Sequence, residues 1–281
     1  MTGSIEQISQ RLAALDRQIE TMGNTFTETY RGYLKQLGQT VKQQLILSCY
    51  HICTENYPKR FLALSMSQRH QLQADLQTFA NQAEIELNEL LQPIAQTQLN
   101  LEPLELPDEL EALLAEVEPE ASEETDLTPL EALTIWQEQL ERSISKTLKS
   151  ASGDANRFLQ DAEILPKRIP QAVIDAASTA ENSDSSAPPN LLNVLVSASE
   201  KSPNSESPPP ALSALMHIVA VNLRVSEIEF NDPAVMNWRN KLRELKQQFQ
   251  TLARSYQKRC REQSIAQAQL AWKSTWTNEN G

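Results

Sequence analysis

The side chains best suited to metal or nucleophile chemistry lie close together at Cys49, His51 and Cys53. Thiolates and imidazoles bind transition metals, and a structural zinc site takes four such ligands. On a helix, Cys49 and Cys53 share one face because they are four positions apart, whereas His51 lies on the opposite side. The other histidines, His70 and His217, are isolated in the sequence. We therefore interpret the two cysteines as small residues buried in a helix packing face, and we predict no metal site.

Motifs for catalysis or cofactor binding are missing from the sequence. There is no Gly-x-Ser-x-Gly nucleophile elbow, and the 6 glycines are too scattered to form a phosphate-binding loop. Paired carboxylates are numerous, but they fall in an acidic segment that we expect to be solvated, where carboxyl pKa values stay ordinary. We predict no cofactor and no enzymatic activity. An enzyme whose pocket forms only in three dimensions is kept as an alternative.

Charge is distributed very unevenly along the 281 residues, whose formal net charge is -12. Between Arg69 and Arg142 the chain has 18 Asp and Glu but no Lys or Arg, whereas from Asn237 to Arg261 it has eight cations and one acid. The two regions either neutralise each other within the fold or face different partners. The candidate interaction surface that we predict at the basic end consists of Arg239, Arg243, Lys246, Arg254, Lys258, Arg259, Trp272 and Trp276.

This basic end suggests two classes of partner besides other proteins. Trp272 and Trp276 are four positions apart, and tryptophan favours the boundary between a membrane and water. An anionic membrane surface is therefore one possible partner. A nucleic acid is the other, but overall acidity and the lack of a nucleic-acid-binding motif make it the less favoured one. The alternative for both features is an ordinary solvated face beside a helix packing stripe.

Two stripes of apolar residues with alternating steps of three and four predict long helices near the two ends of the chain. Such stripes favour self-association or binding of protein partners through helical packing. The N-terminal stripe consists of Ile5, Ile8, Leu12, Leu15, Ile19, Met22 and Phe26. The C-terminal stripe consists of Trp238, Leu242, Leu245, Phe249, Leu252 and Tyr256.

Local signals predict where the helices begin and end. A first helix should cover 4–56, with a break near Gly23, and Ser65 and Gln68 have the spacing of a capping box that begins a second helix ending near Pro93. Thr128-Pro129 should begin a helix that runs to about Ser150, followed by a short helix closed by Pro166. Asp232-Pro233 should begin a long final helix reaching Trp272 or beyond.

Two apolar segments near the Ser/Pro-rich region are ambiguous. The hexamer 191–196 interrupts that region and is either a segment docked on the same chain or a short binding motif, and we favour docking. Residues 212–230 fit both a helix and, through the alternation from Val219 to Val225, a strand. We favour a helix there because the surrounding segments are helical.

The sequence therefore predicts an all-α fold in which long helices form a hairpin and a coiled-coil-like bundle, with an acidic segment and a disordered Ser/Pro-rich linker. The predicted organisation is an N-terminal helical hairpin (1–100), an acidic Pro-punctuated segment (101–127), short helices (128–177), a flexible linker (178–211) and a C-terminal helical region (212–281).

The block 221–240, VNLRVSEIEFNDPAVMNWRN, resembles a segment of uncharacterised helical proteins of photosynthetic bacteria, some of them associated with thylakoid membranes. The resemblance implies a location, the cytoplasmic face of an internal photosynthetic membrane, and no activity. The sequence opens without a basic-then-apolar leader and has 3 cysteines, which indicates the cytoplasm. We expect a non-enzymatic interaction or scaffold protein, peripherally associated with such a membrane through its basic C-terminal helix.

Overall fold

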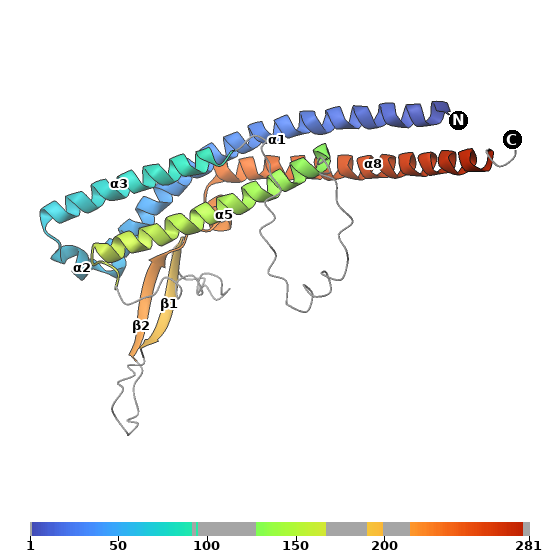
Figure 1. Cartoon of the computed structure of the whole chain (residues 1–281). Coiled ribbons are helices and arrows are strands. Elements are labelled where there is room, and N and C mark those ends of the chain that lie inside the picture. The colour runs from blue at the N-terminus through green and yellow to red at the C-terminus, as the bar shows by residue number, and fades with distance from the viewer. Residues whose placement is uncertain (1, 92–93, 95–127, 167–189, 199–213, 278–281) are drawn as a thin grey trace, which may run out of the picture. The chain divides into compact units, whose positions relative to one another are not determined.

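The protein is described by a computed structural model in which residues 2–91, 94, 128–166, 190–198 and 214–277 are placed (Figure 1). The predicted helical fold is confirmed, since long helices dominate these residues and one two-stranded sheet accompanies them. In chain order the elements are α1 (Thr2–His51), the π-helical turn η1 (Ile52–Asn56), α2 (Pro58–Ala63), α3 (Met66–Glu89), α5 (Pro129–Asp161), β1 (Leu191–Ala198), β2 (Ala214–Val221), α7 (Val225–Asn231) and α8 (Pro233–Thr277).

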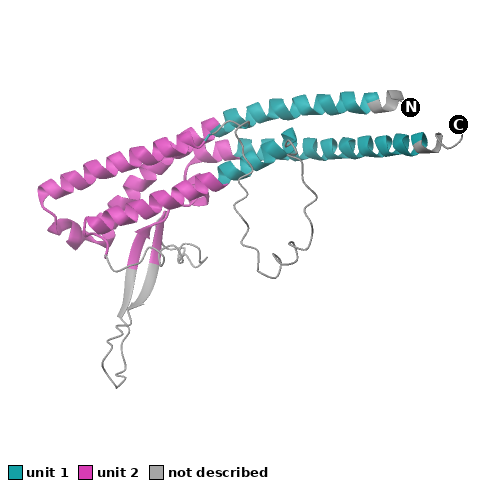
Figure 2. Ribbon diagram, in the orientation of Figure 1, with its two compact units in different colours: residues 1–30, 91–141, 240–281 teal, residues 31–90, 142–239 magenta. Residues whose placement is uncertain are grey.

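The chain forms two compact units (Figure 2). Unit 1 comprises Met1–Tyr30, Leu91–Glu141 and Asn240–Gly281, and unit 2 comprises Arg31–Leu90 and Arg142–Arg239. Helices α1, α5 and α8 each contribute one part to unit 1 and the other part to unit 2. The acidic segment 101–127 and most of the predicted linker 178–211 lie outside the described residues.

In unit 1 the two apolar stripes pack against each other within one chain. Phe26 of α1 meets Phe249 of α8 edge to face, with ring centroids 6.0 Å apart. Further along the pair, Gln263 Nε2 donates to Ser9 Oγ at 3.4 Å, so the two helices run antiparallel. The side chains of Ile19, Phe26, Leu242 and Phe249 are buried. The spacing of three and four thus reflects an intrachain helix pair.

The first turns of α5 complete the core of unit 1. Trp136 packs edge to face on Tyr30 with centroids 5.5 Å apart, and the Tyr30 hydroxyl donates to Glu141 Oε1 at 2.8 Å. Leu133 lies beside Gly23, where an added Cβ would be 3.9 Å from Leu133 Cδ1. The break predicted near Gly23 is wrong, because α1 passes this point without interruption and other parts of the unit pack around it.

Unit 2 contains the predicted helical hairpin of α1 and α3. Lys42 Nζ lies 3.2 Å from Glu84 Oε2, and a Cβ on Gly38 would lie 3.2 Å from the Glu84 carbonyl oxygen, so α3 returns closely along α1. The predicted capping box is confirmed, since Gln68 N donates to Ser65 Oγ and Ser65 N donates to Gln68 Oε1. The short helix α2, which joins the two arms, was not predicted.

The helix predicted over 212–230 is wrong for Ala214–Val221, which form β2, whereas 225–230 are helical and belong to α7. β2 pairs with β1 in an antiparallel register that matches Leu191 with Val221 and Ala198 with Ala214. Ile218 to Val221 are all buried, so both faces of this end of the strand are covered. The hexamer 191–196 lies in β1, which confirms that it docks on the same chain.

Helix α5 is also longer than predicted, because it continues past Ser150 to Asp161 without a second helix. Ser152 and Asn156, which lie beyond the predicted end, make internal contacts of unit 2. Asn156 donates through Nδ2 to the Val221 carbonyl at 2.9 Å and accepts from the Val221 N–H at 2.8 Å. Ser152 Oγ accepts from the Leu223 N–H at 2.9 Å. These side chains bind the end of β2 to α5.

The starts of α5 and α8 are confirmed as predicted. Glu131 N donates to Thr128 Oγ1, and Thr128 N donates to Glu131 Oε2. At the start of α8, Ala234 N donates to Asp232 Oδ1 at 2.8 Å. Side chains thus satisfy backbone N–H groups that have no partner inside the helix. Helix α8 reaches Thr277, in agreement with the prediction of a helix that extends to Trp272 or beyond.

Candidate interaction surface

The two cysteines near the end of α1 are buried thiols. Burial raises the pKa of Cys49 to about 12, helped by the neighbouring Cys53, and burial raises the pKa of Cys53 to about 11. Both therefore stay protonated at neutral pH, where a thiol is a poor nucleophile and a poor metal ligand. His51 Nδ1 lies 2.9 Å from Glu55 Oε1. In the described ranges, no three His, Cys, Asp or Glu side chains are grouped so as to hold a metal ion.

Arg239, the first residue of the predicted surface, lies in a buried network of unit 2. Its Nε donates to Glu229 Oε1 at 2.5 Å, and its Nη2 donates to the Tyr33 hydroxyl at 2.7 Å. The Tyr33 hydroxyl in turn donates to Glu229 Oε1 at 2.8 Å. Only 13% of the Arg239 side chain is exposed, so it ties α8 to α7 and α1 rather than facing a partner. The sequence offers no spacing signal for this triad, because Tyr33 is 206 positions from Arg239.

The remaining cations of the prediction lie in unit 1, and most are exposed on α8. Arg243, Lys246, Arg254 and Lys258 are all exposed, while Arg259 is half-buried and paired with Glu262. Arg261 is exposed too, and sequence reasoning left it out although it follows Arg254 by seven positions. At about 100° per residue these exposed cations gather on one side of the helix. We define the basic face of α8 as Arg243, Lys246, Arg254, Lys258 and Arg261.

Exposed apolar side chains continue the basic face toward the C-terminal end of α8. Ile265 follows Lys258 by seven positions and is 49% exposed, and Trp272 follows Ile265 by seven and is 67% exposed. A step of seven keeps residues on nearly the same side of a helix. The cations and these two apolar side chains therefore share one outward side of α8. Trp276 lies within α8, but its side chain is outside the described residues.

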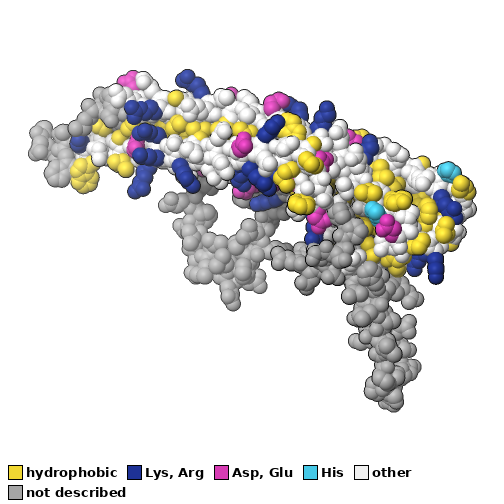
Figure 3. All heavy atoms as spheres, turned by 180° about the vertical axis from the view of Figure 1, so that it is seen from behind, with side chains coloured by type: hydrophobic (Ala, Val, Ile, Leu, Met, Phe, Trp, Pro, Cys, Tyr) yellow, Lys and Arg dark blue, Asp and Glu magenta, His cyan; other side chains and the backbone are white. Residues whose placement is uncertain are grey.

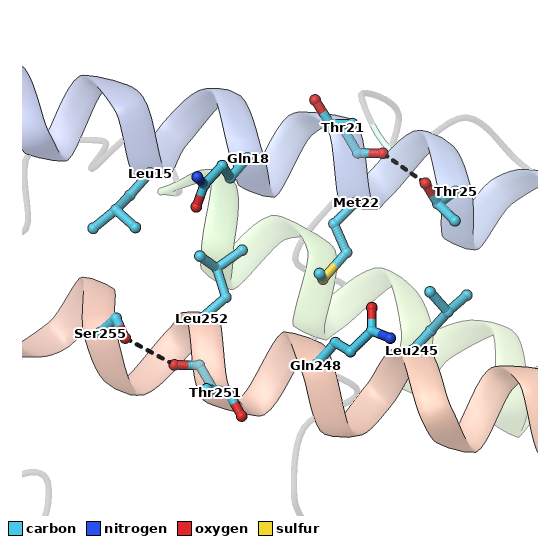
Figure 4. Close-up of a pocket in the computed structure, with 10 residues that line it drawn as sticks. All are labelled: Leu15, Gln18, Thr21, Met22, Thr25, Leu245, Gln248, Thr251, Leu252 and Ser255. Carbon is cyan, nitrogen blue, oxygen red and sulfur yellow. Dashed lines mark hydrogen bonds between the residues drawn. The ribbon is translucent and has the colours of Figure 1, made fainter.

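A shallow groove runs along a different side of the α1–α8 pair in unit 1 (Figure 4). It encloses about 530 Å³, and its apolar lining comes from Leu15, Met22, Leu245 and Leu252. The hydroxyls at its rim already bond within their own helices, as Thr25 does to the Thr21 carbonyl at 3.0 Å. Figure 3 shows a band of hydrophobic side chains with Lys and Arg on both sides of it. No charged side chain lines the groove, so its chemistry suits apolar contact.

A second hollow, of about 460 Å³, lies beside α7 in unit 2. Ser145, Arg224, Ser226 and Glu229 contribute its polar groups. Glu229 is already bonded to Arg239 and Tyr33, and Arg224 Nη1 lies 3.6 Å from Glu227 Oε1. Its two charged groups are therefore engaged with other parts of the fold.

No family model, curated protein or solved structure matches this chain significantly. Within the described residues, no helix combines the length and the apolar character needed to cross a bilayer. The geometry and charge of the chain itself are therefore the basis for assigning a function.

Proposed function

We propose that this chain is a non-enzymatic interaction protein that attaches peripherally to an anionic membrane surface through the basic face of α8. The observation that carries the proposal is the shared outward side of α8, where exposed cations lead into exposed Ile265 and Trp272. From Leu245 to the end of α8 the only acid is Glu262, which is paired with Arg259.

The physical basis is the sum of a charge term and an apolar term. Each Lys or Arg near an anionic membrane surface contributes about 1 kcal/mol, and this contribution decreases as salt screens the charges. An indole ring adds affinity for the headgroup region because its apolar body and its N–H suit the interface. A nucleic acid would use the cations but would gain less from an exposed Ile265, so a membrane is the favoured partner.

The resemblance of block 221–240 to proteins of photosynthetic bacteria adds a location to the proposal. The anionic surface would be the cytoplasmic face of a thylakoid-type membrane. The apolar groove between α1 and α8 is consistent with a scaffold role, because it offers helix packing surface without catalytic groups.

Sedimentation with lipid vesicles tests the proposal. The full chain should sediment with vesicles that contain phosphatidylglycerol and not with vesicles of phosphatidylcholine alone, and added salt should release it. Replacing Arg254, Lys258 and Arg261 with Glu should weaken binding on the order of a hundredfold, from about 1 kcal/mol for each cation lost.

A charge-matched variant serves as the control. Lys35, Lys146 and Lys149 are exposed cations of unit 2, and replacing them with Glu changes the net charge equally. This variant should bind nearly as the native chain does. Equal losses in both variants would show that binding follows net charge alone, and binding of duplex DNA in preference to vesicles would favour the nucleic-acid alternative.

A further inference from the structure

Helix α2 (Pro58–Ala63) is the one short helix between the two arms of the hairpin in unit 2, and none of its residues is buried (Figure 1). Its Leu62 is 65% exposed, and Met66, at the start of α3, is 67% exposed. Single exposed apolar residues are common on soluble proteins. Leu62 and Met66, however, lie close together in the connection between two helices. Together they form a local exposed apolar patch that a partner can cover.

The same segment is strongly basic. Lys59, Arg60 and Arg69 lie in it, and no Asp or Glu occurs between Glu55 and Asp75. Lys59 and Arg60 are exposed, so their charges face solvent beside Leu62. We define the α2 tip as Lys59, Arg60, Leu62, Met66 and Arg69. It combines protruding apolar side chains with cations, which is the pairing that fits an anionic lipid surface.

Backbone carbonyls at the end of α2 already accept hydrogen bonds from a side chain of the same segment. Arg69 Nε donates to the Phe61 carbonyl at 3.2 Å, and its Nη2 donates to the Leu62 carbonyl at 2.6 Å. The Arg69 guanidinium also lies over the Phe61 ring, 5.6 Å from its centroid. A carbonyl that enters an apolar phase without a partner costs free energy, and these bonds remove that cost for the end of α2.

Contacts with α5 and β2 hold the α2 tip in place. Arg60 Nη1 donates to the Ile164 carbonyl at 3.2 Å, just beyond the end of α5. The Tyr57 hydroxyl accepts from the Val219 N–H of β2 at 3.2 Å. The backbone that carries Leu62 and Met66 is therefore already fixed. Their insertion loses little conformational entropy as a result.

We propose that the α2 tip inserts Leu62 and Met66 into the headgroup region of an anionic bilayer, while Lys59 meets the lipid phosphates. This is a second membrane contact, in a different unit from the basic face of α8, and it rests on the proposed peripheral attachment. Neither of the two hollows described above includes a residue of the tip.

Site-specific fluorescence tests the insertion directly. An environment-sensitive fluorophore is attached to Ala63→Cys in a chain that also carries Cys260→Ser. The two remaining cysteines are buried and protonated, so labelling is selective for position 63. With phosphatidylglycerol vesicles the emission should shift to the blue, as expected in an apolar surrounding. The same label on Gln73→Cys, an exposed position of α3, should not shift.

A paired substitution measures the contribution of the tip. Replacing Leu62 and Met66 with Ser should weaken vesicle binding about tenfold through lost apolar transfer. Leu47→Ser with Ile85→Ser is the matched control, because these residues are 44% and 48% exposed elsewhere in unit 2, and its binding should stay within about twofold of native. Melting curves of both variants verify that the fold is kept.

The outcomes separate the two proposals. If chains labelled at position 63 sediment with vesicles but show no blue shift of the emission, the tip insertion is wrong. The attachment through α8 is unaffected by that result. Equal binding by the tip variant and its control would overturn the tip insertion in the same way. Loss of sedimentation by the native chain itself would overturn the proposed function and the tip insertion together.

Discussion

Units 1 and 2 share α1, α5 and α8 but are stabilised in different ways. In unit 1, the α1–α8 pair packs through repeated apolar residues such as Ile19, Phe26 and Phe249. Unit 2 adds buried polar groups that join segments distant in sequence, namely the triad of Tyr33, Glu229 and Arg239 and the bonds of Asn156 to β2. Apolar stripes tolerate many arrangements, whereas buried polar bonds select one. We therefore expect unit 2 to respond more sharply to single substitutions.

The largest effect is expected in the buried triad of unit 2. Arg239→Met leaves the Glu229 carboxylate buried without its cation, which costs about 3–5 kcal/mol in the free energy of unfolding. Denaturant unfolding followed by circular dichroism measures this cost. Arg243→Met, an exposed arginine of the same helix, should change stability by less than about 0.5 kcal/mol. Similar losses in the two variants would remove the contrast between buried and exposed arginines.

An intermediate effect is expected in the apolar core of unit 1. Phe249→Ala removes a buried ring that packs on Phe26 and should cost about 3 kcal/mol. Hydrogen exchange should show faster exchange in 6–30 and 245–270, with the amides of β2 much less affected. Gln250→Ala, at an exposed position on α8, is the control and should leave exchange unchanged. Uniform acceleration across both units would mean that they unfold together, which would weaken the comparison.

The smallest effect concerns Asp232, which lies before α8 in unit 2. Burial raises its pKa, but hydrogen bonds from Thr40 and from the backbone N–H groups of Ala234 and Val235 outweigh burial, so the pKa is lowered overall. A lowered pKa means that the carboxylate stabilises the fold above the unfolded-state pKa of about 4, and that this contribution is lost as pH falls through the folded-state value.

Asp232→Asn should therefore destabilise the protein by about 1 kcal/mol or less at neutral pH, with the difference from the native chain shrinking toward acid pH. Urea unfolding across a pH series measures the difference. Asp154→Asn, at an exposed site in α5 with a short-range ion pair, should show a smaller and flatter difference. A gap that widened in acid would contradict the assignment of a lowered pKa.

Signals confined to a few neighbouring residues predicted structure well in this chain. The capping boxes at Ser65 and Thr128 and the cap at Asp232 lie where the sequence placed them. These signals succeed because the donor and the acceptor are at most three positions apart, so no distant part of the fold is needed to form the bond. The cations of α8 were found from their concentration between Asn237 and Arg261, which is also visible without any distant contact.

Predictions failed where distant residues decide the outcome. The helix end predicted near Ser150 is wrong, because Ser152 and Asn156 lie inside α5 and bond Leu223 and Val221. Arg239 shared the spacing of the surface cations and is nevertheless buried against Glu229. The α2 tip was not predicted, because nothing in the spacing of its apolar residues shows that they remain exposed.

The sequence by itself determined the helical class, the starts of α3, α5 and α8 and the concentration of cations on α8, since these depend on propensity, capping and period within single helices. Only the tertiary structure decided that Ala214–Val221 is a strand, that Arg239 is internal and that the two apolar stripes pair within one chain. The physical reason is that an apolar or polar side chain is satisfied by whichever partner the fold brings to it. Asn156 and Val221 are 65 positions apart, and Arg239 and Tyr33 are 206 positions apart.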